Sequence, residues 1–336
     1  MKLLFMNYTQ GKVNRGAETF IRELSKRLQQ MHSVTVVSAG QALPERWPIL
    51  WRLFLDPPGL AILWFTLKHL PLIWREKYDV VLPQNGGWQA LLVRFITSLY
   101  GGKMVVAGQS GKGWDDRVNV WCFPDAFVAL SSSLRQWAKR INPWVRIAYI
   151  PNGVDLAVFT PQGPVAHFAL ERPLVLCVAA LTSEKRIGLS IEAVTKMNRG
   201  SLLVVGEGLQ REVLLQKGRK LLGERFAMTS ASPQDLPPIY RAADVFTVPS
   251  PSYRAFEIVL VEAMACNVPV VANNDEVRQE IVGEAGLLVD PTNIDDYAKA
   301  LEEALNRDWV DLPRRQAEKF SWDTIAAKYQ HLLTEL

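Results

Sequence analysis

Features that mark several classes of protein are scarce in this sequence. Only three of its 336 residues are cysteines, and Cys122, Cys177 and Cys266 are too scattered to suggest disulfide pairing or a metal motif. We therefore expect a reducing, cytoplasmic compartment. The sequence also contains no Asp-x-Asp motif and no cluster of His and Cys residues, so nothing in it indicates a bound metal ion.

Long apolar runs and a strong charge imbalance are also missing. No uninterrupted apolar run reaches the length of a membrane span, and the apolar start of the chain turns polar at Asn7, too early for a signal peptide. The formal net charge of +4 is too small to indicate a nucleic-acid partner. Hydrophobic and charged residues, at 49% and 21%, are at ordinary levels for a globular enzyme, and the length allows two domains with separate cores.

The stretch 244–272 carries the clearest local pattern. It predicts a strand at Val245–Val248, a loop rich in Pro and Ser, a helix over 256–266 and a second strand at 268–272. A helix that begins at the C-terminal edge of a parallel sheet is a common binding site for anions. Glu262 lies one to two turns inside this mostly apolar helix. It either faces solvent or binds a ligand, and helix statistics alone favour solvent.

Strands alternate with helices along the whole chain. The predicted strands are 2–6, 34–38, 79–82, 103–107, 126–130, 174–179 and 202–205, and the predicted helices are 17–31, 131–140, 187–197, 294–306 and 322–333. The Pro- and Gly-rich stretch 160–172 divides this pattern in two. We therefore predict an α/β fold of two doubly wound, Rossmann-like domains, with a ligand in the cleft between the C-terminal edges of their sheets.

Residues 46–77 combine aromatic rings with cations. The aromatic residues are Trp47, Trp51, Phe54, Trp64, Phe65 and Trp74, and the basic residues are Arg46, Arg52, Lys68, Arg75 and Lys77. The sequence Asp56-Pro57-Pro58-Gly59 is predicted to separate two helical pieces. Rings beside basic residues suit the surface of an anionic membrane. Both helices must also bury one face, however, so a place in the core explains the tryptophans equally well.

Glycines follow several of the predicted strands. Gly16 precedes the first helix, Gly206 and Gly208 follow the strand 202–205, and a glycine-rich loop occupies 108–113. Glycine allows a ligand to approach the backbone closely, and a helix N-terminus favours an anion. Plain turns explain these glycines as well. The loop at 108–113 lacks the spacing of a dinucleotide-binding motif or a P-loop.

Three segments resemble the family-4 retaining glycosyltransferases, which have the GT-B fold. They are DVFTVPS at 244–250, FEIVLVEAMACNVPVV at 256–271 and PNGVD at 151–155, the last followed by Phe159 and Pro161. The resemblance covers nearly the whole chain and is densest from 150 to 291. It implies an N-terminal, acceptor-side domain over 1–160, joined by the C-terminal helix at 320–336, and a nucleotide-sugar-binding domain over 161–319.

The resemblance also implies which residues meet the donor. Glu262 matches the second of two family glutamates, which binds the ribose, and Lys185 matches a lysine that grips the diphosphate. Donor-binding positions are further expected at Gly16, Arg15, Phe256, Ile258, Val259, Gly206, Gly208 and Ala180. Catalytic roles are expected for Lys185, Arg254, Glu257 and Gln109.

Several positions depart from the family pattern. Arg254 stands where the family has its first glutamate, Ala180 replaces a diphosphate-binding arginine, and Gln109 takes the place of a histidine beside the donor sugar. Arg15 replaces the first glycine of a Gly-Gly-Ala-Glu motif. Arg254 either takes over diphosphate binding from the missing arginine or meets an acidic group on the sugar. Glu257, where relatives usually have glycine, is a candidate replacement for the missing carboxylate.

The resemblance implies a retaining hexosyltransferase that moves a sugar from a nucleotide diphosphate-sugar to a glycan, lipid-linked or small-molecule acceptor in cell-surface polysaccharide synthesis. It requires no metal or cofactor, because a cation and a helix N-terminus take up the charge of the departing diphosphate. We expect a cytoplasmic enzyme, which would touch the inner face of the membrane if 46–77 binds lipid. Two alternatives stay open: a catalytically impaired relative that binds nucleotide, and a nucleotide-sugar epimerase.

Overall fold

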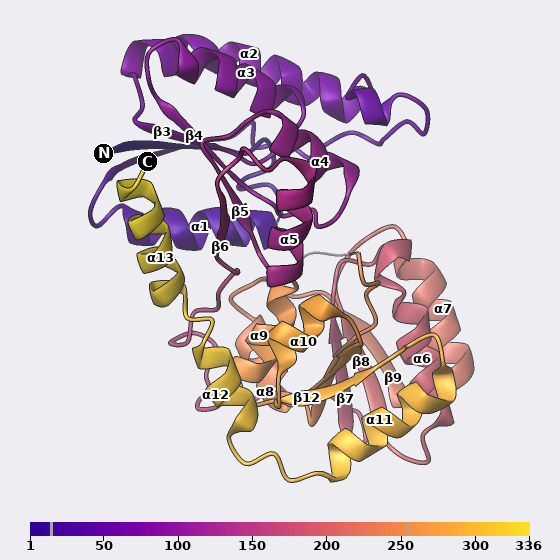
Figure 1. Cartoon of the computed structure of the whole chain (residues 1–336). Coiled ribbons are helices and arrows are strands. Elements are labelled where there is room, and N and C mark those ends of the chain that lie inside the picture. The colour runs from indigo at the N-terminus through magenta and orange to yellow at the C-terminus, as the bar shows by residue number, and fades with distance from the viewer. Residues whose placement is uncertain (14–15, 254–255) are drawn as a thin grey trace. The chain divides into compact units, whose positions relative to one another are not determined.

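The computed structural model describes residues 1–13, 16–253 and 256–336. The chain divides into two compact units, one formed by Met1–Asn152 with Trp322–Leu336 and the other by Gly153–Ser321. In the described residues each unit holds a parallel sheet of six strands, with helices between the strands (Figure 1). The predicted doubly wound α/β architecture is therefore confirmed.

The N-terminal unit is built on a sheet with the strand order β2-β1-β3-β4-β5-β6. Its strands are β1 (Lys2–Met6), β2 (Ser33–Val37), β3 (Val80–Pro83), β4 (Lys103–Ala107), β5 (Ala126–Ala129) and β6 (Ile147–Tyr149). Its helices are α1 (Gly16–Leu28), α2 (Pro57–Glu76), α3 (Trp88–Ser98), α4 (Trp114–Trp121), α5 (Ser132–Ile141) and α13 (Trp322–Thr334). The strands are short apolar runs covered on both faces, and Leu3, Leu4 and Phe5 are fully buried.

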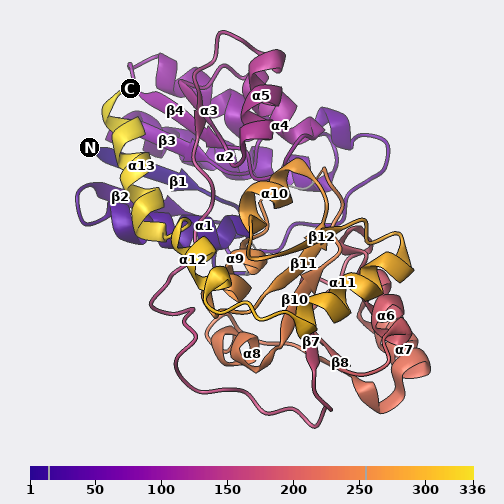
Figure 2. The ribbon, with the colours of Figure 1, turned by 60° about the horizontal axis from the view of Figure 1, so that its bottom comes forward.

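The last helix completes the core of the N-terminal unit. α13 lies along α1 in both views of the ribbon (Figures 1 and 2). The ring of Phe20 on α1 lies 6.2 Å from the ring of Trp322 and 5.6 Å from that of Tyr329, measured between centroids. All three side chains are buried. This aromatic contact stabilises the packing of the C-terminal helix on the first helix of the chain.

The predicted division of 46–77 into two helical pieces is wrong for the first piece and confirmed for the second. Residues Trp51–Leu53 form only a single 3-10 turn, whereas α2 is one helix of 20 residues. Asp56 begins this helix, because its carboxylate accepts a hydrogen bond from the backbone N–H of Gly59 at 3.2 Å. The two prolines that follow occupy the first turn, where their missing N–H groups cost nothing.

The structure also decides between core and surface for most of the aromatic residues in 46–77. Trp47, Trp64 and Trp74 are 55%, 63% and 46% exposed, so the core explanation is wrong for these three. Phe65, the next residue along α2 after Trp64, is only 4% exposed and is a core residue. Trp51 is half-buried, with the guanidinium groups of neighbouring arginines over its ring.

The C-terminal unit is built on a sheet with the strand order β12-β11-β10-β7-β8-β9. Its strands are β7 (Leu174–Val178), β8 (Ser201–Val205), β9 (Phe226–Thr229), β10 (Val245–Val248), β11 (Val270–Asn273) and β12 (Gly286–Val289). Its helices are α6 (Ile187–Lys196), α7 (Arg211–Leu222), α8 (Leu236–Ala242), α9 (Ile258–Ala265), α10 (Glu276–Val282), α11 (Ile294–Asn306) and α12 (Leu312–Glu318).

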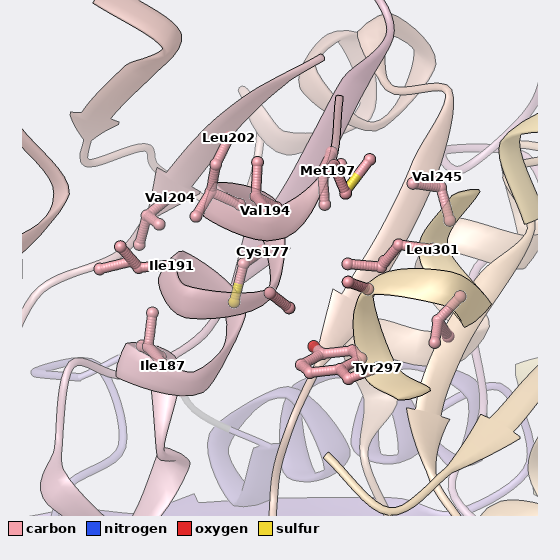
Figure 3. Packing of buried hydrophobic residues seen from close by; sticks show 14 of the residues in the cluster. Cys177, Ile187, Ile191, Val194, Met197, Leu202, Val204, Val245, Tyr297 and Leu301 are labelled. Carbon is pink, nitrogen blue, oxygen red and sulfur yellow. The ribbon is translucent and has the colours of Figure 1, made fainter. Parts of the chain in front are cut away.

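One face of this sheet carries a continuous apolar core. Figure 3 shows Ile187, Ile191 and Val194 of α6, spaced so that they share one face of the helix, beside residues of β7, β8 and α11. The buried hydroxyl of Tyr297 on α11 lies 2.5 Å from Oγ1 of Thr247 and 3.0 Å from Oγ of Ser190. Its polar end is therefore satisfied inside the core.

Gly206 and Gly208 let two loops pack together at the C-terminal edge of this sheet. The loop after β8 hydrogen-bonds to the loop after β7, from Leu181 N–H to Glu207 O at 2.8 Å. Gly206 has φ +158° and Gly208 has φ +151°, in a region that other residues rarely adopt. A Cβ atom at Gly206 would lie 1.9 Å from the carbonyl oxygen of Ala179. Close packing of the chain on itself is thus sufficient reason for both glycines.

Replacing Gly206 by alanine should lower the free energy of unfolding by about 2 kcal/mol or more, because a strained φ and a backbone clash act together. Urea unfolding followed by circular dichroism measures the change. Gly113→Ala is the matched control, since a Cβ there meets no atom within 4 Å, and its effect should stay within about 0.5 kcal/mol. Equal effects of the two substitutions would contradict this account.

Candidate functional site

The charged residues of interest lie at the point where the C-terminal sheet reverses its strand order. β7 and β10 are neighbours, but the chain continues from β7 to β8 on one side and from β10 to β11 on the other. The loops that follow these two strands therefore separate, which leaves a place for a ligand at the C-terminal edge. Lys185 ends the short 3-10 turn after β7, and α9 begins after β10.

A chain of ion pairs joins these loops to α10. Nζ of Lys185 donates to Oε1 of Glu257 at 2.6 Å and to Oγ of Ser250 at 3.3 Å. The other carboxylate oxygen of Glu257 lies 3.0 Å from the guanidinium of Arg278, which also lies 3.4 Å from Asp275. The side chain of Arg278 is fully buried and that of Glu257 is 4% exposed, while Lys185 at 23% is the member open to solvent.

The cations keep the carboxyl group of Glu257 ionised. Burial alone raises its pKa, but the charges of Lys185 and Arg278, with hydrogen bonds from Lys185 and Ser250, outweigh burial and lower the pKa to about 2. Burial likewise lowers the pKa of Arg278, and Glu257 and Asp275 together raise it above its ordinary value. Both members of the buried pair are therefore charged at neutral pH.

Of the two alternatives for Glu262, the one that faces solvent is wrong. Its side chain is buried, because seven of the eight residues of α9 are buried and the helix has no exposed face. The hydroxyl of Tyr240 on α8 donates to Oε2 of Glu262 at 2.8 Å. Burial and the adjacent carboxylate raise the pKa of Tyr240 well above its ordinary value, so the phenol stays protonated. The rings of Phe159 and Phe246 lie within 5.8 Å and 5.6 Å of its ring.

The remaining predicted donor residues of this unit surround the start of α9 and the loop after β7. Phe256 and Ile258 are buried and Val259 is half-buried, and the predicted helix start at 256 was two residues early because Glu257 is the N-cap. Ala180 lies in the loop between β7 and Lys185. Arg254, at the position of the family's first glutamate, lies outside the described residues.

A polar pocket of about 390 Å³ opens beside this cluster. Its lining comes from the loop after β7 and from the ends of β10, β11 and β12, and it consists of Arg186, Pro251, Ser252, Asn273, Asn274, Asp290 and Thr292. Arg186 has φ +52°, and its Nε donates to the carbonyl of Pro249 at 2.8 Å. The strained backbone and this hydrogen bond fix the guanidinium at the edge of the sheet.

The predicted residues of the N-terminal unit lie after β1 and β4. Gly16 begins α1, and two residues later the buried carboxylate of Glu18 accepts a hydrogen bond from Oγ1 of Thr9 at 2.5 Å. Gln109 follows β4 and accepts from Nδ2 of Asn152 at 3.0 Å. Arg15 lies outside the described residues.

The glycine-rich loop at 108–113 is held by the chain's own carboxylate. Asp116 accepts hydrogen bonds from the backbone N–H groups of Ser110 and Gly111 at 3.0 Å and 2.9 Å. Burial raises the pKa of this carboxyl to about 7, although these hydrogen bonds and one from Asn119 oppose the rise. Two N–H groups that a phosphate would use in such a loop are thus already bound.

Three residues of the site were not predicted. Ser250 ends the segment DVFTVPS, which was singled out for its resemblance to the family and not for this serine. Tyr240 lies in the segment before β10, to which no role was assigned. Arg278 gave no signal at all, because a single arginine in a short helix usually faces solvent. Across the residues that the structure describes, no group of three or more His, Cys, Asp or Glu side chains could hold a metal ion.

Two protein-family models match the chain, one in each half. Residues 14–158 match the model described as Glycosyltransferase Family 4, and residues 172–307 match the one described as Glycosyl transferases group 1. Together they cover most of the chain, and the boundary between them falls in the Pro- and Gly-rich stretch.

Curated relatives include several glycosyltransferases. The chain is 30% identical over 243 residues to the GDP-mannose-dependent alpha-(1-6)-phosphatidylinositol monomannoside mannosyltransferase of Mycobacterium tuberculosis. The aligned region covers 62% of this chain and 61% of that protein. The chain is also 33% identical over 211 residues to the D-inositol 3-phosphate glycosyltransferase of Mycolicibacterium smegmatis, covering 56% and 48%. The chain thus spans about half to three fifths of the length of these relatives.

Solved structures match over nearly the whole chain. Sucrose-phosphate synthase from Thermosynechococcus elongatus superposes with a TM-score of 0.83 at 20% identity, covering 99% of this chain and 98% of that one. Anabaena HepE in complex with UDP-glucose superposes with a TM-score of 0.76 at 17% identity, and the match covers 100% of both chains. With the two family models and the two doubly wound sheets, these likenesses show that the chain belongs to the family-4-type glycosyltransferases of the GT-B fold.

Proposed function

We propose that this protein transfers a sugar from a nucleotide diphosphate-sugar to an acceptor, with retention of configuration and without a metal ion. The observation that carries the proposal is the arrangement at the β7–β10 edge, where Lys185, the N-terminus of α9 and the buried carboxylate of Glu262 belong to adjacent loops and one helix. The three groups suit a diphosphate and a ribose, which are the invariant parts of such donors.

Lys185 and α9 would bind the diphosphate. The ammonium is the solvent-accessible end of the ion-pair chain, and it has three N–H donors, of which Glu257 and Ser250 account for two. The N-terminus of α9 adds the backbone N–H groups of its first turn and the positive end of the helix dipole. As the bond to the sugar breaks, both features stabilise the negative charge that develops on the leaving phosphate.

Glu262 would accept hydrogen bonds from the ribose hydroxyls. Its orientation is fixed, because Tyr240 holds one carboxylate oxygen from within the core. The polar pocket lined by Arg186, Asn273 and Asp290 offers both donors and acceptors, as the hydroxyl groups of a sugar require. The relatives suggest GDP-mannose and UDP-glucose as the first donors to test, with a glycan or a lipid-linked molecule as acceptor.

Changing Lys185 to alanine should weaken binding of a nucleoside diphosphate by about 1.5–3 kcal/mol, the cost of losing a charge-assisted hydrogen bond. Binding of the bare nucleoside should not change, since it carries no phosphate. Titration calorimetry with GDP, guanosine, UDP and uridine measures the difference. Lys217→Ala is the control. Lys217 also pairs with a glutamate, Glu192, but it lies on α7 and not in the loops at the sheet edge.

A turnover assay on the same samples separates enzyme from impaired relative. The proposal requires sugar transfer or slow donor hydrolysis by the wild-type protein. Binding with neither would support the catalytically impaired alternative, and formation of an epimer without acceptor would support the epimerase. Equal loss of nucleoside and nucleotide binding in Lys185→Ala would show that this lysine does not meet phosphate.

The two departures at Arg254 and Ala180 are testable together. If Arg254 replaces the arginine missing at 180, Arg254→Glu should weaken donor binding, and adding Ala180→Arg should recover it. The interaction term of the double-mutant cycle should reach about 0.5–3 kcal/mol, as for residues that share one ligand. Additive effects, or a higher transfer rate of Arg254→Glu with neutral donors, would contradict the replacement.

We further propose that the outer face of α2 and α3 binds an anionic membrane. Exposed apolar residues follow one another at helical spacing on both helices: Leu60, Trp64, Leu67 and Trp74 on α2, and Leu91, Phe95 and Leu99 at the end of α3. The two helices pack side by side (Figure 1), and the proposed surface consists of their two stripes together. None of the described helices is long and apolar enough to cross a membrane.

The charges around this surface have the sign that anionic lipid requires. Lys68 lies 5.4 Å from the centroid of the Trp64 ring, and the ammonium of Lys77 lies 3.0 Å from that of Trp74. Glu76 is the only acidic residue in the sequence of α2, and it pairs with Arg75 and Lys2. Each Lys or Arg near an anionic surface contributes about 1 kcal/mol at moderate ionic strength.

The protein should pellet with vesicles that contain phosphatidylglycerol at low salt and be released at high salt. The double substitution Trp64→Ser with Phe95→Ser should lower the bound fraction at least about tenfold, because two exposed rings no longer enter the interface. Trp144→Ser is the control, since Trp144 is 78% exposed and precedes β6. The proposed surface would be contradicted if Trp144→Ser lowered vesicle binding as much as the double substitution, or if the wild-type protein did not bind vesicles.

A further inference from the structure

The carboxylate of Glu257 lies where a diphosphate-binding site needs positive charge. It is the N-cap residue of α9, and its Oε1 is 2.6 Å from Nζ of Lys185. A phosphate oxygen at an ordinary hydrogen-bond distance of about 2.9 Å from that nitrogen would lie no more than about 5.5 Å from the carboxylate oxygen. Any ligand that binds Lys185 through phosphate therefore meets this negative charge.

Arg278 holds the carboxylate in this position. Its guanidinium is fully buried and contacts Glu257 on the side away from Lys185, so it is itself closed to ligand. The two cations Lys185 and Arg278 are matched by the two carboxylates of Glu257 and Asp275. The described part of this cluster is consequently neutral, although it surrounds the site proposed for a dianion.

A carboxylate this close to the bound phosphate distinguishes ligands by the size of their charge. In transfer, the bond between the anomeric carbon and the β-phosphate oxygen breaks and its electron pair stays on that oxygen. The acceptor oxygen bonds to the carbon, and its proton passes to the phosphate and then to water. The product has a terminal phosphate with a second pKa near about 6. At neutral pH it therefore carries about one more negative charge than the nucleotide sugar.

We propose that Glu257 is a specificity-determining residue that discriminates against the nucleoside diphosphate product. Held by Arg278, its carboxylate weakens binding of the free diphosphate more than binding of the nucleotide sugar, which favours release of product after transfer. This inference rests on the proposed function, since it requires that Lys185 meets the diphosphate.

Among the described residues, four charged or titratable groups face Glu257. They are Lys185 from the loop after β7, Arg278 and Asp275 at α10, and Cys177 of β7. Glu257 itself stays ionised, with its pKa near 2, and burial, followed by the charge of Glu257, raises the pKa of Cys177 to about 12. A change in discrimination near pH 6 thus belongs to the phosphate of the ligand.

Glu257→Gln tests the proposal, because glutamine keeps the shape and the acceptor for Lys185 but removes the charge. Dissociation constants are measured by titration calorimetry at pH 5 and pH 8 for GDP, GDP-mannose and guanosine, and for UDP, UDP-glucose and uridine. At pH 8 the variant should bind the diphosphate about tenfold more tightly than the wild type. It should bind the nucleotide sugar only about threefold more tightly and the nucleoside equally.

The pH dependence provides the readout that a purely structural role would not move. In the wild type, the ratio of the dissociation constant of the diphosphate to that of the nucleotide sugar should rise between pH 5 and pH 8, as the terminal phosphate loses its proton. In Glu257→Gln the rise should be smaller. Arg278→Gln, which leaves the Glu257 charge uncompensated, should weaken diphosphate binding at pH 8. Glu257→Gln decides the question even if that second variant does not fold.

Glu192→Gln is the matched control, since Glu192 also pairs with a lysine, Lys217, and its removal should change none of these constants. Equal tightening of diphosphate and nucleotide sugar by Glu257→Gln, or weaker binding of both, would overturn the discrimination and assign Glu257 to positioning or to the sugar. Failure of the wild-type protein to bind any of the diphosphates would instead overturn the proposed function, and this inference with it.

Discussion

The ionic contacts of Glu257 hold together three segments that the sheet topology would otherwise leave apart. Lys185 follows β7, Glu257 caps α9, and Arg278 lies on α10. Glu257 and Arg278 are too buried to be left unpaired, because removing one partner of a buried pair typically costs about 3–5 kcal/mol. These ion pairs therefore stabilise the arrangement of the loops at the sheet edge and orient the Lys185 ammonium.

Much of the fold could be predicted because parallel strands that are buried on both faces have short apolar sequences. β1, β4 and β10 have the predicted ends. The elements that were missed lack such marks. β6 has only three residues, α3 follows two glycines with positive φ, and α4 has no side-chain cap. Such elements form because their neighbours fix them, and that information is not local in the sequence.

The site was less predictable than the fold, and the reason is burial. Lys185 and Glu262 could be recognised from their motifs, but the helical pattern favoured a solvent-facing Glu262, which is buried. The period of a helix locates its apolar face only when another face meets water, and α9 has none. Arg278 could not be predicted for a related reason. Its partner Glu257 lies on another segment, and the pairing exists only in the folded chain.

Both sheets are parallel and six-stranded, but their strand orders differ, and so does the chemistry at their reversal points. In the N-terminal unit that point lies between β1 and β3, where Asn85 donates to Asn7 at 3.1 Å and Asn7 to Glu18 at 3.3 Å. In the C-terminal unit it carries the Lys185–Glu257–Arg278 chain. Amides and a hydrogen-bonded carboxylate suit a ligand with hydroxyl groups, whereas paired ions suit one with charge. The N-terminal reversal point is thus held by hydrogen bonds and the C-terminal one by ion pairs, so a substitution at position 257 or 278 alters the contacts of the second point only.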